Sequence, residues 1–166
     1  MNILCIGNSF SEDATRYLNP IANEALYVRN LYIGGCSLEM HVQNIKEEKA
    51  DYTYQKNAHY LRMISINEAI TKKKWDYVSI QQVSHLSGMK ETYEPYIEFL
   101  VSYIKEKCPS AKIVLHRTWA YEVDSDHEGF KNYLCDRFLM HERILEASSF
   151  FAKKYNLPII PCGDAV

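Results

Sequence analysis

Short apolar runs and longer amphipathic stretches alternate along the 166-residue chain. Five runs are mostly apolar at successive positions, as expected of strands that are covered on both faces of a sheet. They are residues 2–6, 29–33, 76–81, 112–117 and 157–161. Strands that alternate with helical stretches predict β-α-β units and a parallel sheet.

Three helices are predicted from apolar residues that recur at helical spacing. The first covers about residues 12–26, and Pro20 within it should kink it or split off its first turn. The second carries the stripe Tyr93, Tyr96, Ile97, Leu100, Val101 and Ile104. The third covers about residues 131–154 and carries the stripe Leu134, Phe138, His141, Leu145, Ser148 and Ala152. Residues 38–74 contain two further helical patterns, and we interpret the polar stretch between them as a loop.

These elements predict an α/β fold, a three-layer α/β/α sandwich around a flavodoxin-like parallel sheet. Right-handed crossovers and short connections favour the strand order 2-1-3-4-5. In such sheets ligands bind beyond the carboxyl ends of the strands, where the order reverses. The loops "GNSFSED", "GGCSLE" and "QQVSHLSG" follow the first three strands, so we expect the function there. No linker or repeat divides the chain, and we predict that residues 1–166 form a single domain.

Composition and charge exclude several classes of function. The net charge of -2 and the lack of a basic patch argue against a nucleic-acid partner. No stretch is long and apolar enough to span a membrane, and no signal peptide is visible. The five cysteines lack C-x-x-C spacing, which indicates reduced thiols and a cytoplasmic protein. Metal-binding spacings are also absent, so we expect no metal or organic cofactor. The oligomeric state stays open.

The first loop places Ser9 between the end of a strand and the start of a helix. A structural interpretation is that Ser9 and Glu12 form a capping box, or that Ser11 is the N-cap. A chemical interpretation is that Ser9 is a nucleophile and that neighbouring N–H groups stabilise an oxyanion. Both roles are compatible if Ser11 starts the helix and Ser9 faces the crevice. Glu12 and Asp13 argue against a phosphate-binding loop of the flavodoxin type.

The second and third loops add groups that suit an oxyanion hole. Gly34 and Gly35 follow a strand directly, where glycine permits a close backbone approach and either N–H could be a donor. Gln81 and Gln82 follow at the end of a buried strand, where their amides need partners. Each feature also has a structural interpretation, as a tight turn or as a brace for a neighbouring loop. Serine, paired glycines and a strand-end amide in this order are more informative together than singly.

Together these stretches resemble the SGNH (GDSL-type) hydrolases. The stretch "IGNSFSEDA" resembles block I of that superfamily, whose serine is the nucleophile. "GGC" stands at the position of the block II glycine, and "IQQVSH" stands where block III usually supplies an asparagine. Glutamine-containing versions of block III occur in the carbohydrate-esterase branches. The resemblance covers essentially the full chain and includes "NLYIGGCSLE" and "RTWAYE", which look like a bacterial branch of the superfamily.

The resemblance implies a serine ester hydrolase that acts through an acyl-serine intermediate and needs no cofactor. Its substrates would be carbohydrate-like or small acyl esters. Ser9 would be the nucleophile, and its N–H would be one oxyanion donor. The N–H of Gly35, or else of Gly34, would be the second donor. The side-chain amide of Gln81 or Gln82 would be the third.

A serine nucleophile also needs a base and usually an orienting acid. In the SGNH hydrolases both come from an Asp-x-x-His motif after the last strand, and the residues "PCGDAV" that follow the last predicted strand do not contain it. His141 lies on an apolar helical stripe, so we expect a packed core histidine. His127 lies in a polar loop, "EVDSDHEG", that lacks a complete calcium-binding pattern. We therefore expect a C-terminally truncated chain whose own hydrolysis is slow or absent.

Asn8, His85, Trp119 and Tyr121 are the predicted substrate-binding residues. Asn8 replaces the block I aspartate, and His85 follows the third strand. Trp119 and Tyr121 follow the fourth strand and could form a platform for a sugar or acyl group. Trp119 could equally pack against the last helix. The alternative function is a catalytically incomplete binding module for carbohydrates or small ligands. The acidic first loop disfavours a third possibility, a flavodoxin-like nucleotide or flavin domain.

Overall fold

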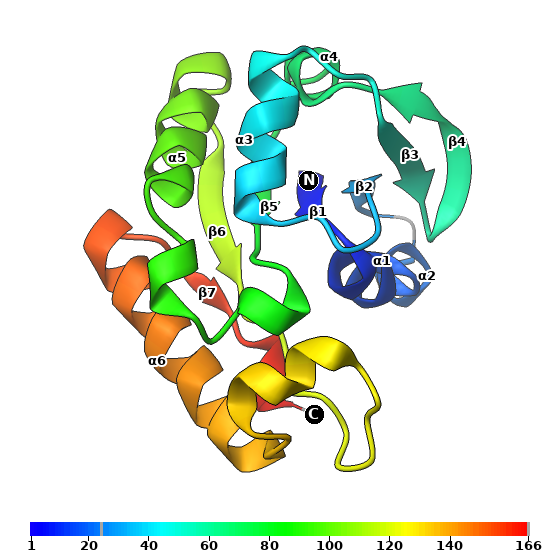
Figure 1. Ribbon diagram of the computed structural model, residues 1–166. Coiled ribbons are helices and arrows are strands. Elements are labelled where there is room, and N and C mark those ends of the chain that lie inside the picture. Colours follow the sequence, from blue (N-terminus) through cyan, green and yellow to red (C-terminus); the bar gives the residue numbers. More distant parts are fainter. Residues whose placement is uncertain (24, 166) are drawn as a thin grey trace.

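The computed structural model describes residues 1–23 and 25–165, and within them the centre is a seven-stranded sheet (Figure 1). The strands are β1 (Asn2–Gly7), β2 (Tyr27–Tyr32), β3 (Tyr52–Lys56), β4 (His59–Ile64), β5 (Tyr77–Ile80), β6 (Lys112–His116) and β7 (Ile159–Ile160). Their order is β4-β3-β2-β1-β5-β6-β7. The segment β2-β1-β5-β6-β7 is parallel and contains the five predicted strands in the predicted order. The α/β fold class is therefore confirmed, and the sheet has two further strands at one edge.

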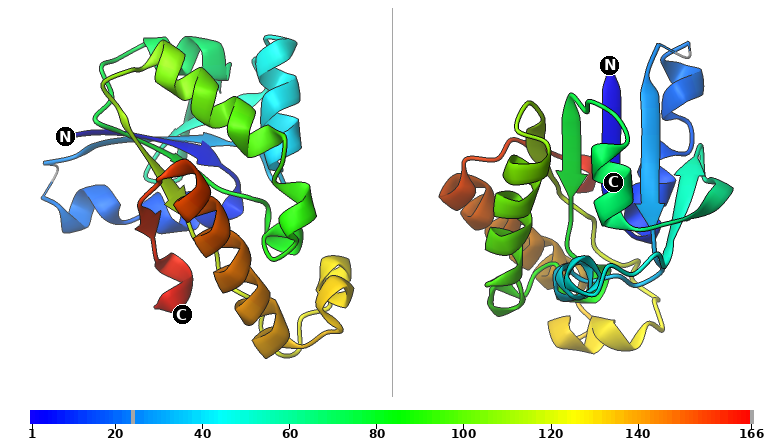
Figure 2. Two further views of the ribbon diagram at one scale, coloured as in Figure 1. Left: turned by 90° about the vertical axis from the view of Figure 1, so that its left-hand side faces the viewer. Right: turned by 90° about the horizontal axis from the view of Figure 1, so that it is seen from above.

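Helices cover both faces of this sheet (Figure 2). They are α1 (Ser9–Thr15), α2 (Leu18–Ile21), α3 (Leu38–Lys46), α4 (Ile66–Thr71), α5 (Tyr96–Lys107) and α6 (Arg137–Tyr155). Helices α3, α4 and α5 contact one another, and Figure 2 shows α3 and α5 opposite α1 and α2 across the sheet. Across the described part of the chain, every helix is too short or too polar to cross a membrane.

The main core lies between the sheet and helices α3, α4, α5 and the C-terminal half of α6. Ile97, Leu100 and Ile104 are fully buried on α5, which confirms the predicted stripe there. Trp75 is also fully buried, and its indole N–H donates to the Ala69 carbonyl over 3.1 Å. Burial of each such large apolar side chain contributes on the order of 2 kcal/mol. This core holds the strand ends, and therefore the loops beyond them, in fixed positions.

The polar stretch between the two middle helical patterns is a β-hairpin, so its interpretation as a loop is wrong. Strand β3 pairs antiparallel with β2, and β4 pairs antiparallel with β3. Tyr52 and Tyr54 point into the core, whereas most residues of β4 are exposed. Because β4 is an edge strand, it lacks the apolar run from which the other strands were predicted.

The first helix begins three residues earlier than predicted, and its N-cap is Asn8. The Asn8 Oδ1 atom accepts a hydrogen bond from the Phe10 N–H over 3.2 Å. The Ser11 hydroxyl instead donates to the Asn8 carbonyl over 2.9 Å, inside the protein. Both capping interpretations, with Ser9 or with Ser11 as N-cap, are therefore wrong. Ser9 is the first residue of α1, and its side chain needs no part in the cap.

The predicted helix of residues 12–26 is in fact two short helices. Helix α1 ends at Thr15, and α2 begins at Leu18. Pro20 lies in the first turn of α2, where a missing N–H leaves no intrahelical bond unmade. The expected separation near Pro20 is therefore confirmed, although the break comes before the proline.

The long helix α6 begins at Arg137 rather than near residue 131. Leu134 and Cys135 have positive φ angles of 56° and 55°, and Asp136 is the N-cap of the helix. A 3-10 helix (Glu128–Tyr133) precedes them. Because the register changes here, Leu134 and Phe138 are exposed rather than buried. The buried face consists of Met140, Ile144, Ala147, Ser148, Phe151 and Ala152.

Candidate active site

Asn8 joins the three loops that were predicted to meet. Its Oδ1 atom accepts from the amide of Gln81 over 2.6 Å as well as from Phe10. Its Nδ2 atom donates to the Cys36 carbonyl over 3.0 Å. The side chain is only 1% exposed, so these bonds hold the loops together from beneath. Asn8 was predicted to bind substrate, but the structure places it under the site, where it positions its neighbours.

Ser9 lies directly above this junction and is exposed. As the first residue of α1, its N–H has no carbonyl one turn earlier to which it can donate. Ser9 also lines a cavity, so its hydroxyl and this N–H belong to one residue of the cavity wall. A nucleophile and an oxyanion donor can therefore come from one residue.

Ser9 opens into a cavity of about 420 Å³. The walls come from the loops after β1, β2 and β5 and from the segment after β6. The lining residues are Ser9, Phe10, Asp13, Gly35, Val83, Ser84, His85, Trp119, Tyr121 and His127. The volume is within the range of small-molecule sites. The crevice predicted where the strand order reverses is therefore present.

Gly35 lines this cavity, and Gly34 is exposed beside it. Gly35 has a φ of +67°, a conformation that side chains other than glycine adopt at a cost, and the space around its Cα is open. The structure thus places Gly35, the glycine that was favoured as donor, in the same cavity as Ser9.

The two glutamines have different surroundings. The Gln82 amide nitrogen donates to the carbonyl and hydroxyl of Thr92, and its oxygen accepts from the N–H groups of Leu38 and Val83. All its hydrogen-bonding capacity is therefore used as a brace, which excludes Gln82 as a free oxyanion donor. The Gln81 amide donates one hydrogen bond to Asn8, and no other bond of that amide is found within residues 1–23 and 25–165. Neither glutamine lines the cavity wall.

Two histidines share the cavity with Ser9. His85 was predicted to lie at the site, and its backbone carbonyl is held by Asn132 and Tyr133 over 3.1 and 3.2 Å. Burial, and the neighbouring His127, lower the pKa of the His85 imidazole. The rings of His85 and His127 stack with centroids 5.9 Å apart.

Trp119 and Tyr121 form the aromatic side of the cavity, as predicted. Trp119 meets Phe10 edge-on with centroids 4.2 Å apart. The Tyr121 hydroxyl lies 2.6 Å from the Ser84 hydroxyl, which ties the segment after β6 to the loop after β5. Burial raises the pKa of Tyr121, so the phenol stays neutral at ordinary pH.

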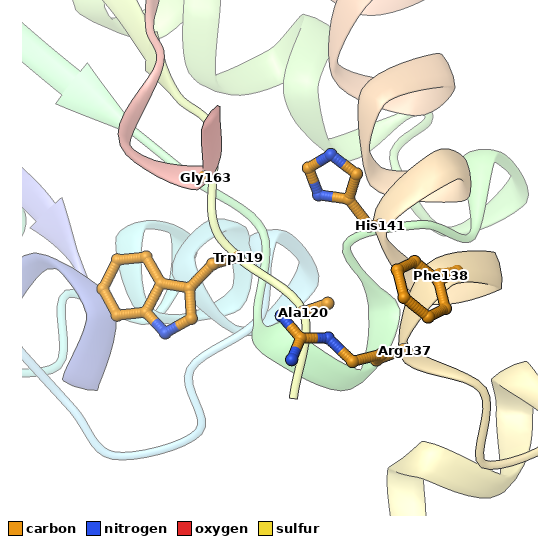
Figure 3. A pocket seen from close by; sticks show the side chains of 6 residues that line it. All are labelled: Trp119, Ala120, Arg137, Phe138, His141 and Gly163. Carbon is orange, nitrogen blue, oxygen red and sulfur yellow. The ribbon is translucent and has the colours of Figure 1, made fainter. Parts of the chain in front are cut away.

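A second cavity, of about 210 Å³, also has Trp119 in its wall (Figure 3). Arg137 and His141 extend into it from α6, and Gly163 closes another side. His141 is therefore a half-buried cavity residue, and its prediction as a packed core histidine is wrong. Trp119 borders both cavities, which favours the pocket interpretation, and its ring contacts are with Phe10 and His116 rather than with α6.

His127 is one of the cavity residues that were not predicted from the sequence. The letters Asp124-Ser125-Asp126-His127 spell Asp-x-x-His, but they follow β6 rather than the last strand. Asp13 and Ser84 were also missed, because a single sequence does not show which residues of a polar loop turn inward. No group of three or more metal-ligating side chains is found among the described residues.

Comparison with known proteins places this geometry in a family. A profile described as "Domain of unknown function (DUF4886)" matches residues 2–166. The chain belongs to this family. A solved DUF4886 protein from Bacteroides uniformis is 38% identical, with a TM-score of 0.90, over 98% of this chain and 67% of that one. No curated protein matches the chain.

More distant structural neighbours, which come from outside the family by their descriptions, show a related fold. A proposed SGNH hydrolase from Slackia heliotrinireducens is 21% identical, with a TM-score of 0.65, over 96% of this chain and 77% of that one. Axe2, an acetylxylan esterase from Geobacillus stearothermophilus, is 16% identical, with a TM-score of 0.54, over 99% and 77%. The DUF4886 chain thus has an SGNH-like fold, as the resemblance of its motifs implied.

Proposed function

We propose that this DUF4886 protein is a serine ester hydrolase of the SGNH type with Ser9 as its nucleophile. The observation that carries the proposal is the exposed Ser9 at the junction of three loops, open to a cavity of about 420 Å³. Ser9 Oγ attacks the ester carbonyl carbon and loses its proton to a base. The alcohol leaves with a proton, and water then hydrolyses the acyl-serine.

The oxyanion of the tetrahedral intermediate needs donors that are fixed before the reaction. We assign the N–H groups of Ser9 and Gly35, which both border the cavity. Gln81 is assigned as a positioning residue instead: its amide holds Asn8, and its side chain is buried and lines no wall of the cavity. Gln82 and Gly34 have no part in this assignment.

Neither histidine of the cavity is assigned as the base. The His127 Nδ1 atom already accepts the Gly129 N–H over 3.0 Å, and the remaining nitrogen then carries the proton. No carboxylate within the described residues is hydrogen-bonded to the His85 ring to orient it. We therefore propose that deacylation by this chain alone is slow, because no oriented base activates the water.

The substrate class is an acyl ester of a carbohydrate-like alcohol. Trp119 and Tyr121 supply flat apolar surface, and Ser84 and Asp13 supply polar groups beside it. The acetylxylan esterase among the structural neighbours is consistent with this class. The free thiols of Cys5, Cys36 and the other cysteines suit a cytoplasmic location.

The test uses p-nitrophenyl acetate, whose good leaving group makes acylation possible with a weakly activated serine. We expect mass spectrometry to show acetyl-Ser9 accumulating while steady-state turnover stays slow. Ser9→Ala should remove that acetyl group, whereas Ser102→Ala on the exposed side of α5 should not. If the folded protein never carries an acetyl group on Ser9, the assignment of Ser9 as the nucleophile is wrong. If turnover is fast and Ser9→Ala abolishes it, the proposal that the chain lacks an oriented base is wrong.

The second candidate is a carbohydrate-binding module of the same fold. The lack of an oriented base and the aromatic cavity wall both favour it. Sugar binding without any acetylation of Ser9 would identify this function.

A further inference from the structure

The His127 ring is held in one tautomer. Its Nδ1 atom accepts the Gly129 N–H over 3.0 Å, so Nδ1 carries a lone pair and not a proton. In a neutral imidazole the proton is then on Nε2. His127 therefore carries a hydrogen-bond donor at the far edge of its ring, and its side chain lines the same cavity as Ser9.

The position of this donor is fixed as well as its proton. The ring packs against Tyr121 with centroids 4.7 Å apart, and on His85 at 5.9 Å. Gly129 lies so close to His85 that an added Cβ would come within 2.2 Å of the His85 Cβ. Residue 129 must therefore be a glycine, so that the loop can approach His85 while its N–H donates to His127.

The same contacts exclude the role that the letters Asp-x-x-His suggest. A base must receive the Ser9 proton on a nitrogen that faces the serine, with its other N–H oriented by an acid. Here the Nδ1 atom is bonded to Gly129 and not to Asp124, whose side chain is exposed. His127 is arranged to donate a hydrogen bond rather than to accept a proton.

The charges around the cavity limit what this donor can bind. Residues 122–128, which carry His127, contain four acids and no lysine or arginine, and Asp13 also lines the cavity. An anionic ligand would therefore meet like charge at Asp13 and near His127. A neutral ring with several hydroxyls can stack on Tyr121, donate to Asp13 and accept from His127.

We propose that His127 Nε2–H is the specificity-determining donor of the cavity and that it binds a hydroxyl oxygen of an uncharged, polyhydroxylated alcohol. The inference rests on the proposed function only in naming that alcohol as part of an ester. Binding of the alcohol itself does not require Ser9 to react.

The test is NMR titration of the 166-residue protein with methyl xyloside, and with glucuronate as the anionic comparison. We expect methyl xyloside to bind and glucuronate to bind several-fold more weakly. His127→Phe keeps a ring but removes the donor, and should weaken methyl xyloside binding about two- to tenfold. His127→Gln keeps an N–H donor and should stay near wild type. His59→Phe, on the exposed strand β4, is the matched control.

The tautomer supplies a measurement that needs no variant. Long-range ¹H–¹⁵N spectra of the imidazole should show the proton on Nε2, and a proton on Nδ1 would overturn the proposal. The proposal would also be overturned if methyl xyloside did not bind, or if glucuronate bound more tightly. It would be overturned as well if His127→Phe kept the wild-type affinity for methyl xyloside, or if His127→Phe and His127→Gln lost equal affinity. Ser9→Ala should bind methyl xyloside like wild type, so a failed acetylation test and a failed binding test are separate results.

Discussion

Asn8 makes three side-chain hydrogen bonds, one to each loop of the site. In Asn8→Ala the helix loses its cap, and the buried Gln81 amide and Cys36 carbonyl lose a partner. We expect the free energy of unfolding to fall by about 2–4 kcal/mol, as measured by urea denaturation. Ser65→Ala removes the exposed N-cap of α4 and should cost only about 1 kcal/mol. Equal losses in the two variants would contradict the joining role of Asn8.

Gln81 and Gln82 are neighbours in sequence, but we expect opposite phenotypes. Gln82→Ala leaves the buried Val83 N–H without its acceptor and should lower the free energy of unfolding by about 1–3 kcal/mol. Gln81→Ala should slow the acetylation of Ser9 about tenfold, because Asn8 then loses a bond that fixes the loop carrying Ser9. Urea denaturation and mass spectrometry on both variants check this. Slower acetylation in Gln82→Ala alone would reverse our assignment.

The sequence could show that the first loop holds polar residues, but not which of them caps the helix. Asn8, Ser9 and Ser11 all have side chains that cap helices. Which residue caps the helix depends on Gln81, which is 73 positions away and donates the second hydrogen bond to Asn8 Oδ1. Ser9 remains free to react because its neighbour Asn8 is the N-cap of the helix. No local rule contains that long-range partner.

At the scale of elements, the β3–β4 hairpin turns through two residues with unusual backbone angles. Asn57 and Ala58 have φ angles of 52° and 62°, as in the type I′ turns that favour Asn-Gly. Ala58→Gly should raise the free energy of unfolding by about 0.5–1 kcal/mol, because glycine adopts positive φ without steric cost. Ala14→Gly, on the exposed side of α1, should lower it by about 1 kcal/mol. A loss in both variants would show that the turn at Ala58 is unstrained.

This turn also explains why the hairpin was not predicted. Alanine in place of glycine removes the strongest short-range hairpin signal. The alternation that remains is partial, since Tyr52 and Tyr54 are buried but β4 contributes almost no buried side chain. The parallel strands have no such ambiguity, because both of their faces are covered.

At the scale of the whole molecule, the strand order could be predicted because it follows from general rules. Right-handed crossovers leave few arrangements of five parallel strands, and the site then lies where the order reverses. Gly35, His85 and Tyr121 were placed correctly for this reason. His127 could not be placed in this way, because its loop wraps back on the cavity through contacts with Tyr121 and His85.

Two buried histidines should make the stability of the whole molecule depend on pH. Burial lowers the pKa of His41 to about 3 and that of His116 to about 4, from 6.5. As the pH falls below 6.5, the unfolded chain binds protons at these histidines and the folded protein does not, so the free energy of unfolding decreases. Each histidine contributes up to about 1.4 kcal/mol per pH unit in this window.

The window from pH 6.5 to 5 separates histidines from carboxylates, which titrate mostly below it. His85, whose pKa is also lowered, adds to the slope in the same direction. Urea denaturation across this window should show a steep fall in the free energy of unfolding. In His41→Gln the slope should decrease by about one proton, whatever the stability of the variant at pH 7. His59→Gln removes an exposed histidine and should leave the slope unchanged. The same slope in His41→Gln as in wild type would mean that His41 is protonated inside the folded protein. That result would also place a charge beside Tyr52, whose hydroxyl lies 2.8 Å from the ring.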